Sequence, residues 1–178
     1  MAVIPVAMTL LEAAKLGDDS AFELLLRPLL EPGYRLAGGM LQDHQAAQDA
    51  VQEAAFKAWR KLRQLRDGSD MRPWFLGIVA NECRTTRRGR WWSVLKIDAE
   101  RRSTEAPDDA AVRGIDLRNA LKRLRPQQRL VVVLYFYLDL PLDEIAAITS
   151  ASYAAVRQRL YRGIRELKAD FPISEAQT

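Results

Sequence analysis

The sequence predicts an all-α protein built from two small helical domains joined by a polar linker. Apolar residues recur every three or four positions over most of the chain, and strand-like alternation bounded by turn residues is scarce. One polar stretch, Lys96–Asp116, has no sustained apolar face. The chain has 178 residues and is 48% hydrophobic, which is enough for two small cores. We therefore place an N-terminal domain at 1–95, the linker at 96–115 and a C-terminal domain at 116–178.

The N-terminal half begins with two expected helices separated by a break. Asp19 and Ser20 suit the start of the first helix, because their side-chain oxygens can accept hydrogen bonds from the free amides of the first turn. Pro32 and Gly33 are expected to interrupt it, since proline removes a helical hydrogen bond and glycine disfavours helix. The second helix is expected at Tyr34–Leu41.

Two longer helices are expected next. Apolar residues at helical spacing place one of them over Gln45–Leu65. The stretch Asp67–Asp70 contains a glycine and is expected to form a loop. Pro73 suits the first turn of the following helix, where an amide has no helical partner. That helix is expected to run from Trp74 to about Arg88.

The C-terminal half starts with leucines at helical spacing, from Leu117 to Leu124, and the pattern stops before Pro126. The next stretch, Gln127–Leu138, is apolar on almost every side, so it could be a buried strand or a buried helix. Expected helices on both sides favour the helix.

The most informative stretch is Asp143–Arg165. Ile145 and Ile148 are spaced to face one core, Thr149–Ala151 is a short turn, and Ser152 is a suitable N-cap for a second helix. That helix has an apolar stripe formed by Val156, Leu160, Ile164 and Leu167. Its other faces carry Arg157, Arg159, Arg162, Arg165 and Lys168 against Glu166. This pattern is typical of a helix-turn-helix, although an ordinary helical hairpin with a solvated basic face would share it.

The sequence also excludes several kinds of site. Cys83 is the only cysteine and His44 the only histidine, so neither an intramolecular disulfide nor the usual Cys/His zinc site can form. We expect Cys83 to be buried, His44 to be on the surface, and no cofactor or metal. The apolar N-terminus lacks a basic start and is broken by Pro5, unlike a signal peptide. No run approaches the roughly 20 apolar residues of a membrane-spanning helix, so no membrane insertion is expected.

Four motifs in the C-terminal half carry a resemblance to a known family. They are Leu124–Arg129, Tyr135–Tyr137, Glu144–Ala146 and Val156–Arg162. The stretch that contains them resembles the C-terminal domain of the extracytoplasmic-function class of bacterial sigma factors. In that family this domain reads the −35 promoter element. The −35 contacts that the resemblance implies are Ser152, Tyr153, Arg157, Gln158, Arg159, Tyr161 and Arg162.

Three residues of this domain depart from the family pattern. Pro141 stands where the family usually has a serine or threonine, so side-chain capping is lost there. Ser150 replaces the usual turn glycine, and Ala155 replaces the usual threonine. The fold is expected to survive these changes, while the base contacts differ in detail.

The N-terminal half carries further matching motifs. Ala47–Glu53 followed by Ala58 and Trp59 resembles the family's helix for binding core RNA polymerase, at the clamp helices of its largest subunit. The spacing places most of the implied contacts on one partly acidic helical face, which suits a basic helical partner. The implied contacts are Asp49, Gln52, Glu53, Phe56 and Trp59. Without the resemblance, a merely solvated acidic face would be the preferred interpretation; with it, docking is preferred.

Trp74–Asn81 and the arginines after it resemble the family's −10 recognition helix. Amide side chains can bind base edges and arginines can hold phosphates. The preceding loop, Gln64–Met71, corresponds to the family's pocket for a base flipped out of the stack. The implied −10 contacts are Asp67, Ser69, Asp70, Trp74, Ile78, Asn81, Arg84, Arg87 and Arg88. Trp74 could instead belong to the core, and Trp91–Trp92 could cover apolar surface or contact a partner.

These motifs together predict a sigma factor that binds core RNA polymerase and directs transcription initiation, with single-stranded DNA bound at −10 and duplex DNA at −35. The resemblance further implies a cytoplasmic location and an anti-sigma factor as regulator. No metal cluster or acid–base pair of an enzyme such as a nuclease is visible, so no catalytic activity is expected. A stand-alone helix-turn-helix regulator, the other alternative, would leave Asp49–Trp59 and Trp74–Arg90 unexplained.

Overall fold

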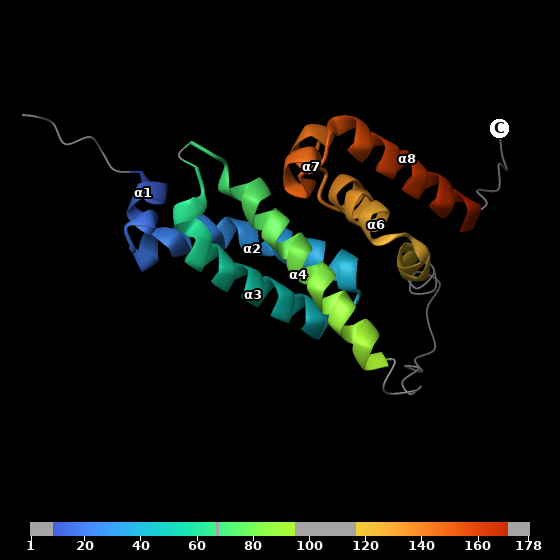
Figure 1. The fold of residues 1–178 in the computed structure, drawn as a ribbon, viewed down its shortest axis with the longest axis horizontal. Helices are drawn as coiled ribbons and strands as arrows, with labels where there is room; N and C mark the ends of the chain where they lie inside the picture. Colours follow the sequence, from blue (N-terminus) through green and yellow to red (C-terminus); the bar gives the residue numbers. More distant parts are fainter. Residues whose placement is uncertain (1–8, 67, 95–116, 171–178) are drawn as a thin grey trace, which may run out of the picture.

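A computed structural model describes residues 9–66, 68–94 and 117–170, and these residues form helices and short connections without a strand (Figure 1). The N-terminal half contains α1 (Leu10–Lys15), α2 (Asp19–Leu41), α3 (His44–Lys61), the 3-10 turn η1 (Leu62–Gln64) and α4 (Met71–Val94). The C-terminal half contains a helical segment at 117–123, α6 (Pro126–Val132), the π-helical turn η2 (Val133–Tyr137), α7 (Leu142–Thr149) and α8 (Tyr153–Asp170). The all-α prediction is confirmed, and the whole of the expected linker, 96–115, lies outside the described residues.

The helix α2 is continuous, so the expected break at Pro32–Gly33 is wrong. Pro28 also lies inside this helix. One side of α2, which includes Leu29 and Leu36, is buried against α3 and α4, and this packing outweighs the local preference for a break. Gly33 belongs to that side: a Cβ atom there would stand 3.2 Å from the ring of Phe75 on α4. The missing side chain lets the two helices approach closely.

The short helix α1 was not predicted, because six residues are too few to show apolar periodicity, but its N-terminus has a recognisable capping motif. Thr9 accepts a hydrogen bond from the amide of Glu12 at 3.2 Å, and the carboxylate of Glu12 accepts one from the amide of Thr9 at 2.7 Å. A threonine followed three residues later by glutamate is the pattern of such a capping box. Ala13 and Ala14 are buried where α1 packs on α2.

The apolar stretch Gln127–Leu138 is helical, as expected, rather than a strand. It begins as α6 and widens into η2. Leu130 and Leu134 are fully buried, whereas Phe136 at the end of the segment is 58% exposed. The segment therefore forms the centre of the C-terminal half and also presents aromatic surface.

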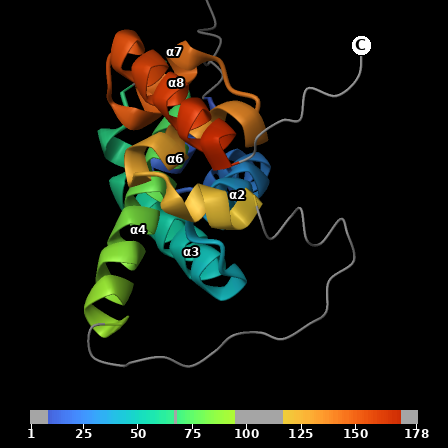
Figure 2. The ribbon, with the colours of Figure 1, turned by 90° about the vertical axis from the view of Figure 1, so that its right-hand side faces the viewer.

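The two halves pack against each other and share one continuous hydrophobic core. Figure 2 shows α6, α7 and α8 lying to one side of α2 and α4. α4 contacts α7, and α2 contacts η2. Arg72 of α4 lies 3.5 Å from the carboxylate of Glu144 on α7. None of the described helices has the length and apolar character needed to cross a membrane.

Candidate nucleic-acid interface

The predicted helix-turn-helix is present in α7 and α8. Ile145 and Ile148 are buried, and the hydroxyl of Ser152 accepts a hydrogen bond from the amide of Ala155 at 3.2 Å, so the expected core contacts and N-cap are confirmed. Pro141 precedes α7 without a side-chain cap, also as expected. Ser150 adopts the left-handed conformation, with a φ of 51°, that a turn glycine would adopt more easily.

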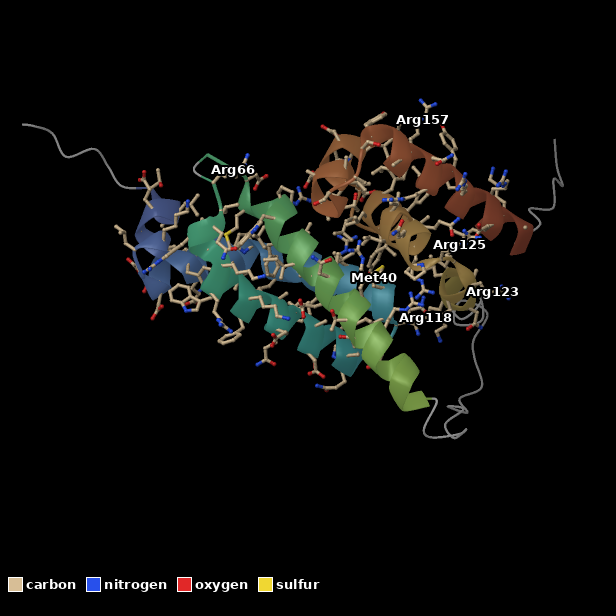
Figure 3. The ribbon with its side chains drawn as sticks, in the orientation of Figure 1. Met40, Arg66, Arg118, Arg123, Arg125 and Arg157 are labelled. Carbon is tan, nitrogen blue, oxygen red and sulfur yellow. The ribbon has the colours of Figure 1, made fainter. Side chains whose placement is uncertain are left out.

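The orientation of α8 follows from its buried stripe. Val156 and Leu160 are buried against the rest of the C-terminal half, and Ile164 and Leu167 pack against the same core. The opposite side is open, with Tyr153 54% exposed. Figure 3 shows Arg157 pointing away from the protein. Of the predicted −35 residues, Ser152, Tyr153, Arg157, Gln158, Tyr161 and Arg162 are exposed and Arg159 is half-buried.

Most of the predicted polymerase contacts share an open face of α3. Asp49, Gln52, Glu53 and Phe56 are all exposed. The remaining predicted contact, Trp59, is half-buried and packs on Phe22 of α2, with ring centroids 5.0 Å apart. The structure therefore gives Trp59 a packing role that its position in the motif did not indicate.

A lysine links this face to α4. The ammonium group of Lys57 lies 2.6 Å from the carboxylate of Glu82 and 3.2 Å from that of Glu53. Its hydrogen bond with Glu82 and the second one with Glu53 raise the pKa of Lys57 against the opposing effect of desolvation. On the acidic surface of α3, the negative charge of Glu53 is thus partly neutralised by Lys57, whereas the carboxylate of Asp49 is exposed to solvent.

The predicted −10 residues are spread along α4 and the loop before it. Trp74 and Ile78 are half-buried against the core, which favours packing as part of their role. Asn81 is exposed, and its side-chain oxygen Oδ1 accepts a hydrogen bond from the guanidinium of Arg84 at 2.8 Å. Ser69 and Asp70 are exposed in the loop before α4, whose first residue, Met71, lies about 15 Å from Asn81 along the helix axis, given 1.5 Å per residue. Asp67 and the side chain of Arg88 lie outside the description.

Arginines of both halves line one cleft, which sequence reasoning did not predict. Its volume is about 860 Å³. α4 contributes Arg84 and Arg87, while the C-terminal half contributes Arg125, Arg159 and Arg162. Figure 3 places Arg125 and Met40 at the boundary between the halves. The cleft depends on how the halves pack, so no local pattern in the sequence could have revealed it.

The expectations for Cys83 and His44 are confirmed. Cys83 is buried, and burial followed by the nearby charge of Glu82 raises the pKa of its thiol to about 12. It is therefore a protonated packing residue at neutral pH. His44 is exposed at the start of α3. Within 9–66, 68–94 and 117–170, no group of three or more histidine, cysteine or acidic residues could hold a metal ion.

Comparisons with known proteins match both halves. Residues 25–93 match the family described as "Sigma-70 region 2" and residues 115–167 match "Sigma-70, region 4". The chain is 29% identical to the "RNA polymerase sigma factor SigV" of Bacillus subtilis over 136 residues, covering 76% of this chain and 81% of the relative. It is 27% identical to the "RNA polymerase sigma-H factor" of Pseudomonas aeruginosa over 168 residues, covering 86% of this chain and 87% of the relative.

Two solved structures have the same fold. The sigma factor RpoE in complex with the anti-sigma factor NepR from Bartonella quintana has a TM-score of 0.70 and 23% identity, covering 86% of this chain and 98% of that one. CnrH in complex with the cytosolic domain of CnrY has a TM-score of 0.70 and 22% identity, covering 90% and 93%. With both sigma-70 regions matched in the order of the two helical halves, the chain belongs to the sigma-70 family of RNA polymerase sigma factors, in its extracytoplasmic-function class.

Proposed function

We propose that this sigma factor divides promoter recognition between its halves: α3 docks on core RNA polymerase, α4 captures the −10 strand and α8 reads the −35 duplex. As a member of its family the chain directs RNA polymerase to promoters. The observation that carries the proposal is the amphipathic character of α8. A buried stripe holds the helix, and the opposite side presents arginines and tyrosines that can reach phosphates and base edges of a major groove.

The polymerase contact is assigned to the open face of α3. Asp49, Gln52, Glu53 and Phe56 give this face a partly acidic surface beside an exposed aromatic ring, which suits a basic helical partner such as the clamp helices of the largest subunit. Asn81 and Arg84 are the best-supported −10 contacts, because they are accessible and already hydrogen-bonded to each other. All of these roles are binding roles, and the proposal includes no catalytic step.

The packed arrangement of the halves is a closed state in this proposal. DNA rises about 3.4 Å per base pair, so elements about 25 base pairs apart are separated by about 85 Å. A compact chain of this length has a radius of gyration of only about 16 Å. Reading both elements together therefore requires the two halves to separate.

We also propose an anti-sigma factor as regulatory partner and the cytoplasm, where the polymerase works, as the location. The two solved relatives are each described as complexes with such a factor or with a partner's cytosolic domain. Near the junction of the halves, this chain has an apolar recess of about 890 Å³, lined in part by Tyr34, Leu117 and Phe136. A partner helix with an apolar face would cover this exposed surface.

Transcription in vitro by core polymerase with the full chain, followed by sequencing of the transcripts, tests the proposal. We expect discrete start sites preceded by a shared pair of elements near −35 and −10. A protein that bound duplex promoter tightly alone but never bound core enzyme would contradict the division of roles. It would favour a stand-alone regulator instead.

A further inference from the structure

The cleft between α4 and the C-terminal half concentrates positive charge among the described residues. Its arginines, Arg84, Arg87, Arg125, Arg159 and Arg162, come from three separate helix regions. The described lining contains no acidic residue. One lining residue, Gln128, donates a hydrogen bond at 2.8 Å to the carboxylate of Glu166, which does not itself line the cleft. Like charges gathered in this way repel one another unless an anion joins them.

Two guanidinium groups at this boundary each have one buried donor without a described partner: Arg87, which lines the cleft, and its neighbour Arg129. Nη1 of Arg87 and Nη2 of Arg129 are both buried and have no hydrogen-bond partner in the described part of the chain. Arg129 is only 3% exposed, and its other donors bind the carbonyls of Leu121 and Met40. Burial, followed by repulsion from Arg87, lowers the pKa of Arg129 to about 10, so the guanidinium of Arg129 remains charged at neutral pH. Buried charged donors without partners are unfavourable and indicate a missing acceptor.

We propose that this cleft binds a phosphate-class anion that bridges the two halves of the sigma factor. Planar guanidinium groups pair with phosphate oxygens through two parallel hydrogen bonds, and arginine suits such recognition better than lysine. The volume of about 860 Å³ exceeds the needs of a single phosphate and lies in the range of small-molecule pockets. A diphosphate group, free or carried by a nucleotide, is the chemistry that fits.

Such an anion would favour the closed state, because it touches α4 on one side and α6 or α8 on the other. It would also occupy Arg84, Arg87, Arg159 and Arg162, which the proposed function assigns to DNA. The anion and promoter DNA therefore compete for the same side chains. The anion site itself does not rest on the promoter function, and its binding is measured without polymerase or DNA, so the two proposals can fail separately.

Isothermal titration of the full chain with sodium pyrophosphate, and separately with ATP, at an ionic strength held constant with sodium chloride, tests the site. Arg125→Ala removes an exposed cleft arginine that has no assigned DNA role, and Lys122→Ala removes a neighbouring exposed charge that lines no described cavity. We expect one anion per chain. Its Kd should rise about ten-fold in Arg125→Ala, the loss of one charge-assisted hydrogen bond, and stay unchanged in Lys122→Ala.

If one anion bridges the two halves, removing an arginine from either half should weaken its binding. Arg87→Ala in α4 and Arg159→Ala in α8 should each weaken pyrophosphate binding by about ten-fold, because one anion contacts both. Thermal unfolding of each variant establishes that it is folded before it is titrated. Tighter binding of ATP than of pyrophosphate identifies a nucleotide as the source, and equal affinity identifies free phosphates. Either result supports the site.

Four outcomes would overturn the proposal, the last of them by refuting the bridge. The first is no saturable binding of pyrophosphate or ATP at millimolar concentration. The second is an equal Kd for Arg125→Ala and Lys122→Ala, which would reduce the effect to general charge. The third is displacement of pyrophosphate by a hexaglutamate peptide that binds more tightly, which would make the cleft a docking site for an acidic peptide. A loss of affinity confined to variants of one half would refute the bridge.

Discussion

The guanidinium of Arg129 donates a hydrogen bond to the main-chain carbonyl of Met40 at 3.1 Å, and so ties the C-terminal half to the end of α2. The same group binds the carbonyl of Leu121. Arg129→Leu would keep much of the buried volume and leave both carbonyls without this donor. We expect it to lower the free energy of unfolding by about 1 to 3 kcal/mol, measured by urea denaturation, because two carbonyls left without a donor outweigh the removal of one unpartnered guanidinium donor. Lys122→Leu, an exposed neighbour, should change it by less than about 0.5 kcal/mol.

Two adjacent glycines of α2 provide a matched pair for testing the contact between the halves. A Cβ atom on Gly39 would stand 2.7 Å from Cγ1 of Val133, whereas one on Gly38 would have nothing within 4 Å. Gly39→Ala is expected to destabilise the protein by about 1 to 3 kcal/mol through overpacking. Gly38→Ala should be neutral or stabilise it by up to about 1 kcal/mol, because alanine favours helix.

The double variant Gly39→Ala with Val133→Ala separates overpacking from other effects. The smaller side chain at 133 makes room for the new methyl group, so the two changes should be less harmful together than the sum of each alone. Urea denaturation of the four proteins of this cycle gives the coupling free energy. Strict additivity would mean that the halves do not pack in solution as they do in the structure.

Short-range patterns made the helix-turn-helix predictable. The spacing of Ile145 and Ile148, the cap at Ser152 and the stripe on α8 are all local features, and the structure agrees with each. The same local logic failed at Pro32–Gly33, where burial of Leu29 and Leu36 keeps α2 continuous. Helix-breaking residues report a local preference, and tertiary packing can override it.

The relationship between the halves lay beyond local patterns. Nothing in the sequence near Gly39 shows that it meets Val133, and nothing near Arg87 shows that it lies beside Arg129. These contacts join residues far apart in the chain, and their existence depends on the packing of whole helices. The exposed faces of α3 and α8 were predicted because each face belongs to one helix, whereas the arginine cleft was not because it belongs to several.

Arg157 offers a test of phosphate binding by α8, since it is exposed and lies outside the arginine cleft. Arg157→Ala is expected to weaken binding to −35 duplexes similarly for all sequences. It should also reduce the slope of log K against log salt concentration by about one, as the loss of one phosphate contact requires. Fluorescence anisotropy across a salt titration measures both. Arg60→Ala, an exposed arginine on α3, should leave the slope unchanged, and an unchanged slope in Arg157→Ala would remove Arg157 from the contact.

Cys83 should make the protein less stable at high pH. Its folded pKa of about 12 lies above the usual value of 9.0, so the folded state holds the proton more tightly than the unfolded state. The thiol's contribution is complete below about pH 9 and is lost as the pH rises towards 12. Between pH 8 and 10.5 the wild type should lose about 2 kcal/mol more than Cys83→Ala, in which the remaining titrating groups are the same. Parallel urea denaturation curves across this range would contradict a buried, protonated thiol.

The acidic face of α3 can be separated from DNA binding by one double variant. Asp49→Ala with Glu53→Ala removes two exposed carboxylates from the proposed polymerase contact, and we expect the Kd for core polymerase to rise at least about ten-fold. Glu23→Ala with Glu31→Ala removes the same charge from exposed positions of α2 and serves as the control. Affinity for a −35 duplex should be the same in both variants, because α8 is untouched. If the control weakened polymerase binding as much as the test variant, general charge would explain the effect and the assignment to α3 would fail.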